Sequence, residues 1–329
     1  MGRPRVARRY SVAGVRVNSL PGDALRWSLE GGTPRSYTTG LRRIDDVTAG
    51  GLRAGEVSIV AAATGMGKTA FVEQVALSMS LEHDVLFMPL EMGTRDTLIR
   101  MAAKIARCSF SDFLRTGLDR VTEQELNVRN LFFYEPKFGS GLFVDDVLNT
   151  IANHRCPVVM LDHVRHIEGW LGDSKSPHVG PSNIVRRLRE GARELNTHIV
   201  LCAQLNRMGY GKRPQLQNIQ DTSALEQLAS LVLLLHRPFY HQGGFRDTVT
   251  EVFVSKNRYG PMCKIHYRWV GPTMSVWEMS KDEERIVECC GSRGARGSDA
   301  PAVPVERDRY DVDDEEEGGL GGRLFPDEE

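Results

Sequence analysis

A phosphate-binding loop is the feature of this sequence that points most directly to a chemical function. Gly67, Lys68 and Thr69 follow an apolar run and open a helix-like segment, as in the G-x-x-x-x-G-K-[ST] pattern, although Ala62 replaces its first glycine. Backbone N–H groups of such a turn cradle phosphate oxygens, and the start of the helix adds partial positive charge. The residues expected to bind ATP are Ala62, Ala63, Thr64, Gly65, Met66, Gly67, Lys68 and Thr69.

Within this loop we expect Lys68 to contact the β- and γ-phosphates, and the Thr69 hydroxyl to bind Mg²⁺. The sequence also offers an acidic ligand for the magnesium ion. Asp162 ends the apolar run Val158–Leu161, and ligands of open α/β sheets gather at the carboxyl ends of strands. We predict that Asp162 binds Mg²⁺; a helix N-cap or a surface aspartate is the alternative.

The base that activates water does not follow Asp162 directly, because the next residue is His163. Glu91 ends another apolar run, and it would lie beside the phosphate-binding loop if the two strands are neighbours. A carboxylate in that place can orient the attacking water. We therefore predict that Glu91 is the catalytic base, and a glutamate that caps a helix is the alternative.

These residues must be positioned by a layered α/β domain, because short apolar strands alternate with helices from Thr39 to Met279. Strands rich in β-branched residues are typical of a mostly parallel sheet that helices flank on both faces. The expected strands are Val57–Ala63, Val85–Leu90, Leu131–Tyr134, Pro157–Asp162, Ile199–Gln204 and Leu231–Leu235. The expected helices include Gly67–Leu81, Arg95–Arg107, Val144–His154 and Ser182–Leu195. An antiparallel hairpin at the sheet edge is predicted from Thr248–Ser255 and Met262–Val270.

Composition indicates a soluble globular protein, with 329 residues of which 41% are hydrophobic and 26% charged. No apolar run approaches the ~20 residues that span a bilayer. The 6 cysteines form no C-x-x-C pair, which argues against a zinc or disulfide framework and favours a reducing, cytoplasmic setting. We divide the chain into a basic N-terminal segment (1–37) with a candidate linker helix at Asp23–Glu30, an ATPase domain (38–280) and a disordered tail (281–329).

Several motifs in order resemble the RecA-like motor domain of DnaB-type replicative helicases, from Thr38 to Met279. Each motif is weak alone, but together their order and spacing are specific. The motifs are Thr39-Gly40 with Thr48-Ala49-Gly50-Gly51-Leu52, the loop Ala62–Thr69, Leu90-Glu91-Met92, Ala203-Gln204-Leu205-Asn206-Arg207, Leu225-Glu226-Gln227 and Lys256-Asn257-Arg258-Tyr259-Gly260-Pro261. The sequence departs from the family after Asp162, where His163 and Arg165 stand in place of the more common Tyr and Gln.

The resemblance implies an ATP-dependent DNA helicase with a RecA-like P-loop ATPase core, which moves along single-stranded DNA as a homo-hexameric ring with 5′–3′ polarity. In that family the Lys and Arg that match Lys256 and Arg258 reach the γ-phosphate held by the neighbouring subunit, and Gln204 would sense the same phosphate. From the residues alone, a solvated hairpin tip explains Lys256 and Arg258 equally well. The short N-terminal segment resembles motor-only members of some phages, for which the setting would be the host cytoplasm.

Contacts to single-stranded DNA are expected from the loop that follows Gln204. Arg207, Lys212 and Arg213 suit the phosphate backbone, and the alternative is an exposed loop whose charges favour solubility. A DNA-contacting Arg-Glu-Ser-Gly of the family aligns with Gln220-Asp221-Thr222-Ser223, so its Arg is lost. Backbone N–H groups and the Thr222 hydroxyl remain as contacts there.

The acidic run Asp311–Glu329 resembles tails with which phage helicases dock a polymerase, and a primase or another replisome protein is a further candidate partner. Composition alone favours a solubilising tail. The alternative function is a RecA- or RadA-like recombination or repair ATPase on single-stranded DNA, for which we expect a zinc module or a polymerisation segment ahead of the core. A non-translocating ATP switch is a third interpretation, and Glu91 together with Arg258 argues against it.

Overall fold

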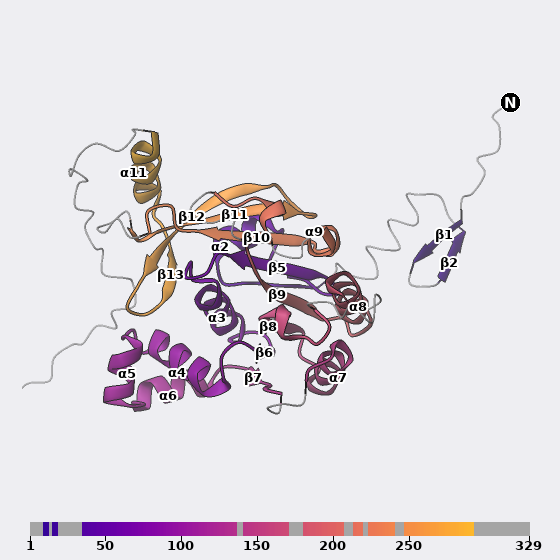
Figure 1. The fold of residues 1–329 in the computed structure, drawn as a ribbon, viewed down its shortest axis with the longest axis horizontal. Coiled ribbons are helices and arrows are strands. Elements are labelled where there is room, and N and C mark those ends of the chain that lie inside the picture. The colour runs from indigo at the N-terminus through magenta and orange to yellow at the C-terminus, as the bar shows by residue number, and fades with distance from the viewer. Residues whose placement is uncertain are drawn as a thin grey trace, which may run out of the picture.

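A sheet of 9 strands forms the centre of the protein, in the order β13-β12-β11-β10-β5-β9-β8-β6-β7, and helices lie on both of its faces (Figure 1). The computed structural model describes residues 9–12, 15–18, 35–136, 141–170, 180–206, 213–219, 223–240 and 247–292. The six strands β10, β5, β9, β8, β6 and β7 run parallel to one another. Strands β11, β12 and β13 are added antiparallel beside β10, at one side of the sheet. The predicted fold class, a mostly parallel sheet with an antiparallel edge hairpin, is therefore confirmed.

The parallel strands begin and end close to where the sequence predicts them. They are β5 (Val57–Ala62), β6 (Val85–Pro89), β7 (Leu131–Phe133), β8 (Val158–Asp162), β9 (His198–Gln204) and β10 (Leu231–His236). The edge strands are β11 (Val249–Asn257), β12 (Cys263–Val270) and β13 (Ser275–Glu278). The hairpin prediction covered β11 and β12 but not β13, a strand of four residues that follows a short turn.

Two apolar cores, one on each face of the sheet, explain why the central strands are apolar without alternation. Val60 and Ala62 of β5 point into the core on the side of α3 (Lys68–Met79), whereas Ile59 and Ala61 point into the opposite core. That second core is closed by α7 (Val144–His154) and α8 (Pro181–Glu194). Every residue of β5 is buried as a result, as expected for a strand between two helical layers.

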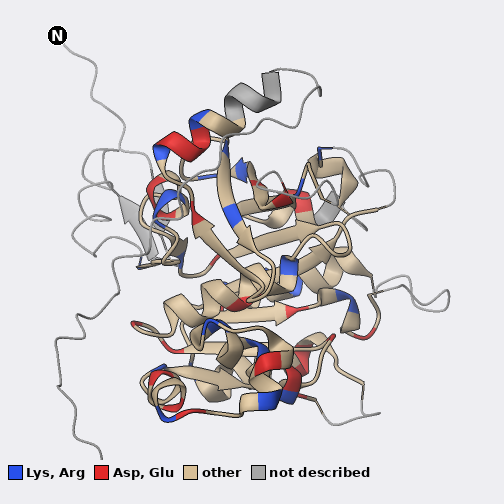
Figure 2. Cartoon of the chain, turned by 90° about the vertical axis from the view of Figure 1, so that its left-hand side faces the viewer, with Lys and Arg blue, Asp and Glu red and all other residues tan. Residues whose placement is uncertain are grey.

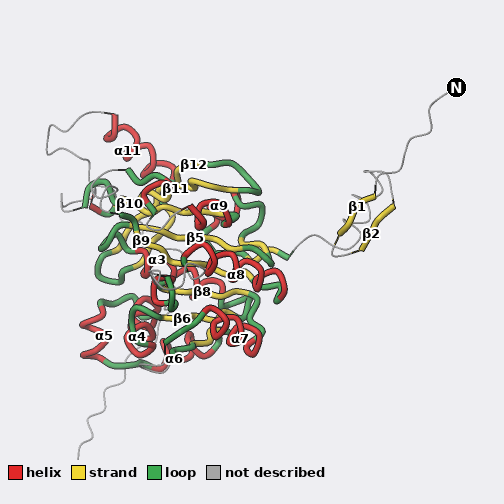
Figure 3. The backbone as a smooth tube through the Cα atoms, turned by 45° about the vertical axis from the view of Figure 1, so that its right-hand side comes forward, coloured by secondary structure: helices red, strands yellow, loops and turns green. Residues whose placement is uncertain are grey.

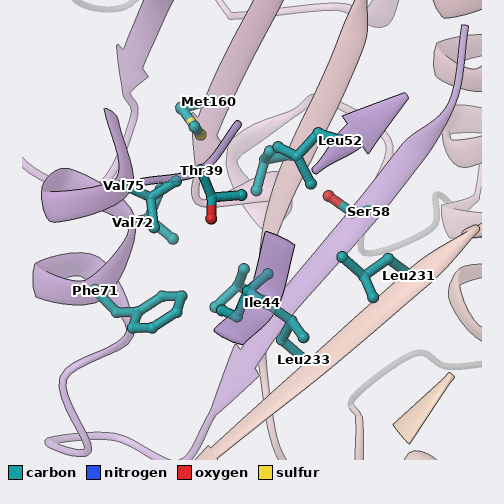
Figure 4. A pocket seen from close by; sticks show the side chains of 12 residues that line it. Thr39, Ile44, Leu52, Ser58, Phe71, Val72, Val75, Met160, Leu231 and Leu233 are labelled. Carbon is teal, nitrogen blue, oxygen red and sulfur yellow. The ribbon is translucent and has the colours of Figure 1, made fainter. Parts of the chain in front are cut away.

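The first core contains a small cavity of ≈ 20 Å³ between α3, β5 and β10 (Figure 4). Side chains such as Ile44 and Phe71 line it, and its polar lining is limited to Thr39 and Ser58. Both hydroxyls already have hydrogen-bond partners, since Thr39 binds Asp45 and Ser58 binds His198. The cavity is therefore a packing void with no free polar group to bind a ligand.

Helices α4 (Thr94–Ile105), α5 (Phe110–Thr116) and α6 (Arg120–Asn127) form a small lobe beside β6, where they lie next to one another (Figure 3). Only α4 is among the predicted helices. The other two are short, at 7 and 8 residues, and are fixed by the N-caps Ser109 and Asp119, whose side chains accept backbone N–H groups. Short helices with so few apolar residues give a weak periodic signal in a sequence.

The prediction of disorder from residue 281 onward is wrong for its first part, because Lys281–Ser292 forms helix α11. Its acidic first turn (Figure 2) docks on basic residues from distant segments: Glu284 pairs with Arg43, and Glu283 pairs with Arg268. Val287 adds an apolar contact to Met279 and Val249. These partners are far away in sequence, so local composition could not reveal the helix.

Further short elements precede the phosphate-binding loop. Strands β3 (Ser36–Tyr37) and β4 (Leu52–Arg53) pair with each other around helix α2 (Arg42–Val47), and β1 (Arg9–Val12) pairs with β2 (Val15–Asn18). The candidate linker helix Asp23–Glu30 and the acidic tail lie outside the described residues. Within the described part of the chain, every helix is too short or too polar to cross a membrane.

Candidate nucleotide site

The phosphate-binding loop joins the carboxyl end of β5 to the first turn of α3, as the sequence predicts. Gly65 and Gly67 have φ angles of 81° and 91°. Residues other than glycine rarely adopt φ angles in this positive range. A Cβ atom on Gly67 would also lie 2.6 Å from Cζ3 of Trp269. Conformation and space therefore both require glycine at position 67, and the backbone of the loop is held in one shape.

Two acidic side chains lie close to the lysine of this loop. The Lys68 ammonium lies 3.1 Å from Oδ1 of Asp162 and 3.7 Å from Oε2 of Glu91. Burial alone would raise the pKa of Asp162, but the nearby Lys68 ammonium and hydrogen bonds from Thr69 and Lys68 hold that pKa below its usual value. Asp162 is therefore an anion at neutral pH, as a cation ligand must be.

Glu91 reaches the loop by a different route from the one proposed in the sequence analysis. Strand β6 does not neighbour β5, because β9 and β8 lie between them. The backbone N–H groups of Leu90 and Glu91 instead donate to the carbonyl oxygen of Asp162, which bends the chain after β6 back across the end of β8. The Glu91 side chain is 54% exposed and lines the nucleotide pocket, so water can approach its carboxylate.

Gln204 ends β9, which pairs directly with β5, so that Gln204 lies opposite Ala62 in the sheet. Its side-chain amide donates to Oγ1 of Thr64 at 2.7 Å. The structure thus places the predicted sensor glutamine against the phosphate-binding loop of its own chain. That geometry is consistent with a γ-phosphate sensor, a role that stays a prediction.

The nucleotide pocket includes side chains that the sequence did not predict there, among them Arg100, Trp269 and Met274. Trp269 comes from β12, and its indole lies against Gly67. Arg100 comes from α4, where its guanidinium lies 3.1 Å from the buried carboxylate of Glu73. An aromatic residue in an edge strand and an arginine in a helix carry no sequence signal for a nucleotide, because only the fold brings them to the loop.

His163 also lines this pocket, and its imidazole is buried. Burial and the Lys68 ammonium lower the pKa of His163 to about 3, so the ring is neutral at physiological pH. Its Nδ1 accepts the backbone N–H of Arg165 at 3.2 Å. The sequence analysis used His163 only to exclude a glutamate at this position.

The residues present fit a magnesium–nucleotide complex. Thr69 hydrogen-bonds to the Asp162 carboxylate, so a hydroxyl and an ionised carboxylate, two hard oxygen ligands, lie together beside the loop. The pocket beside them has a volume of ≈ 450 Å³ and opens to solvent. These are the two residues that we predicted as magnesium ligands.

Lys256 and Arg258, the remaining two predicted catalytic residues, are not brought to this pocket. Lys256 pairs with Val232 near the start of β10, and Arg258 binds the carbonyl of Ser230 through its backbone N–H. Their side chains donate to carbonyl oxygens at the end of α9 (Ser223–Leu228), where Arg258 Nη2 lies 3.0 Å from Gln227 O. Both residues therefore lie at the amino edge of the sheet, opposite the phosphate-binding loop.

Of the predicted DNA-binding residues, only Arg213 lies in the described part of the chain. Its guanidinium pairs with the buried carboxylate of Glu251, at 3.1 Å, yet 65% of its side chain is exposed. Arg207, Lys212 and Thr222 lie outside the described residues. A DNA contact by any of the four stays a prediction.

Comparison with known families matches residues 36–277 to the DnaB-like helicase C terminal domain. The replicative DNA helicase DnaC of Bacillus subtilis is 27% identical over 250 residues, which cover 70% of this chain and 54% of that protein. The replicative DNA helicase DnaB of Haemophilus influenzae is 28% identical over 256 residues, which cover 71% of this chain and 53% of that protein. The chain thus spans about half the length of the curated relatives it matches.

Solved structures share this fold. The ATPase domain of G40P superposes with a TM-score of 0.69 at 23% identity, covering 79% of this chain and 98% of that one. A DnaB-like replicative helicase, whose structure was described with its interactions with primase, gives a TM-score of 0.69 at 22% identity, covering 79% of this chain and 68% of that one. These similarities confirm the predicted RecA-like architecture.

Proposed function

This chain belongs to the family of DnaB-like helicase C-terminal domains, and from that premise we propose that it is the ATP-hydrolysing motor of a DnaB-type replicative DNA helicase. The observation that carries the proposal is the convergence of Lys68, Asp162, Glu91 and Gln204 around one phosphate-binding loop. A protein that only bound ATP would need the loop. It would not need an exposed carboxylate poised 3.7 Å from the lysine ammonium.

In the proposed reaction the loop and Lys68 hold the phosphates of ATP, and Glu91 accepts a proton from the attacking water while it orients that water. Gln204 reports the state of the γ-phosphate to the segment that follows β9. Trp269 lines the pocket and packs beside Gly67, where its indole would contact the bound nucleotide. Magnesium held by Thr69 and Asp162 would neutralise charge on the phosphates.

The second half of each site comes from a neighbouring subunit in a homo-hexameric ring. Lys256 lies at the level of Ile59 in the sheet and Arg258 lies beyond the level of Ser58, which is about 10 Å and about 16 Å along β5 from Ala62 at ~3.3 Å per residue. They are therefore too far away to serve their own loop. A cation donated by the next subunit would stabilise negative charge in the transition state.

The remaining parts of the proposal concern DNA and partners. Arg207, Lys212, Arg213 and Thr222 contact the backbone of one DNA strand, and ATP turnover moves these contacts along the strand with 5′–3′ polarity. The acidic tail docks a polymerase, a primase or another replisome protein. The protein works in the cytoplasm, and in the host cytoplasm if a phage encodes it.

An unwinding assay on forked DNA tests the proposal. We expect ATP-dependent strand separation that is retained when the 3′ tail is removed and lost when the 5′ tail is removed. Lys68→Ala should lower ATP turnover by about 10²–10³-fold, because it removes the charge that holds the phosphates. Lys281→Ala, an exposed lysine of α11, is the matched control. ATP hydrolysis with strand exchange, and without unwinding of any fork, would instead support a recombinase.

A further inference from the structure

His163 carries a hydrogen-bond donor that nothing in the described part of the protein satisfies. The residue is 4% exposed, and its Nε2 atom is buried without a hydrogen-bond partner among the described residues. The same side chain lines the nucleotide pocket. A buried polar atom without a partner is rare in folded proteins, and at the wall of a ligand site it indicates that the partner is the ligand.

The hydrogen bond made by the other ring nitrogen fixes what Nε2 can do. Nδ1 accepts the backbone N–H of Arg165, so Nδ1 carries no proton. In a neutral imidazole the proton must then reside on Nε2, which is a donor. The missing partner of His163 is therefore an acceptor, and an anionic oxygen satisfies it best.

The surroundings of His163 show which acceptor this is. His163 directly follows Asp162, whose carbonyl oxygen accepts the backbone N–H groups of Leu90 and Glu91. His163 is thus adjacent in the chain to the predicted magnesium ligand, lines the same pocket as the predicted base, and lies within the electrostatic reach of Lys68. The nearby His166 ring has its centroid 6.5 Å away and lines a different pocket, so it does not supply the acceptor.

We propose that the Nε2–H group of His163 donates a hydrogen bond to the γ-phosphoryl group of bound ATP, which makes His163 a catalytic residue of this site. The inference rests on the proposed function. It adds a γ-phosphate contact on the side of β8 to the contacts expected from Lys68 and from Gln204 on β9. ADP lacks the γ-phosphoryl group, so the hydrogen bond from His163 would strengthen the binding of ATP but not the binding of ADP.

Nucleotide titration of the full chain tests this assignment. We expect His163→Phe to bind a non-hydrolysable ATP analogue about 10- to 100-fold more weakly, the range for a hydrogen bond to a charged group, while ADP binding is unchanged. His163→Gln keeps an N–H donor on a side chain of similar reach and should recover most of the affinity. His166→Phe is the matched control, because its ring lines the neighbouring pocket.

An unchanged ratio of ATP-analogue to ADP affinity in His163→Phe would overturn the assignment, as would an equal loss for both nucleotides. If His163→Phe does not fold, His163→Asn shortens the side chain and keeps it polar, and the same selective loss is expected. Failure of the proposed function is distinguishable from failure of this inference. If the proposed function fails, the wild-type chain does not unwind forked DNA, whereas failure of this inference appears only in the nucleotide affinities of the His163 variants.

Discussion

The central sheet carries functional residues both where its parallel strands end, here called the carboxyl edge, and where they begin, the amino edge. The side chains at these two edges differ in what they contact. At the carboxyl edge, Asp162, Glu91 and Gln204 each lie within hydrogen-bonding or ion-pairing distance of the phosphate-binding loop. At the amino edge, Lys256 and Arg258 also lie together, but they donate to backbone carbonyls at the end of α9. The carboxyl edge gathers acidic and polar side chains around the loop, whereas the amino edge presents two cations that donate to main-chain oxygens.

This difference supports the proposal that each chain contributes two halves of different catalytic sites, which lie at opposite ends of the same strands. Because the two groups lie at opposite ends of strands that are buried in the sheet, we do not expect a single chain to bring them together. A second copy that presents its amino edge to the carboxyl edge of the first would complete the site. Substitutions at either edge should therefore impair ATP hydrolysis in different ways.

Arg258→Ala is expected to have the largest effect, a fall of about 10³–10⁵-fold in ATP hydrolysis, the range for an arginine supplied in trans. Nucleotide binding should change little, because the loop of each subunit is intact. Mixing Arg258→Ala with Lys68→Ala subunits should restore part of the activity, since some sites then combine a wild-type loop with a wild-type arginine. A steady-state ATPase assay across mixing ratios measures this complementation.

Arg42→Ala is the control for this experiment, because Arg42 is an arginine with an 85% exposed side chain outside both edges. Mixtures that stay inactive at every ratio would contradict the assignment of Arg258 to a neighbouring site. Substantial activity of Arg258→Ala alone would do the same, because the amino edge would then be dispensable.

Glu91→Gln should have the next largest effect, a fall of about 10²–10⁴-fold in the rate of hydrolysis. The amide keeps the shape of the side chain but cannot accept a proton from water, so ATP should still bind. Equilibrium binding and single-turnover hydrolysis measured together separate the two steps. Glu125→Gln is the control, since the Glu125 side chain is similarly exposed, at 52%, and lies on α6.

A Glu91→Gln variant that binds ATP as weakly as Lys68→Ala would argue that Glu91 acts on binding and not on the chemical step. Retained hydrolysis in Glu91→Gln would mean that the base lies elsewhere on the carboxyl edge.

Truncation before Pro301 should have the smallest effect, with basal ATP hydrolysis unchanged, because both edges are complete by residue 292. Truncation before Lys281 makes the informative contrast. That change removes α11 and leaves Arg43 and Arg268 without their acidic partners, so the melting temperature should fall. Thermal unfolding of both truncated chains checks this, and an equal melting temperature for the two would show that α11 adds no stability.

Most of the central fold could be predicted because its determinants are local. Helix α7 begins and ends at the predicted residues, and the apolar strands from β5 to β10 match their predictions to within about two residues. The elements that were missed depend on distant partners. Helix α11 needs Arg43 and Arg268, and no pattern within residues 281–292 indicates that those arginines are close.

By itself, the sequence determined the chemistry of the nucleotide site. The types and spacing of Gly67, Lys68 and Thr69 define a phosphate-binding turn, and an aspartate or glutamate after an apolar strand is placed at the carboxyl edge by the alternation of strand and helix. These properties depend on a few neighbouring residues, and so they can be predicted without coordinates.

Only the tertiary structure decided how those residues meet. It showed that Glu91 reaches the loop although β6 is not a neighbour of β5, because the carbonyl of Asp162 binds its backbone. It placed Lys256 and Arg258 on the far edge, and it placed His163 in the wall of the pocket with its Nε2 atom buried and without a partner among the described residues. Strand order and hydrogen-bond direction arise from packing between segments far apart in the chain, which the spacing of residues within a motif does not encode.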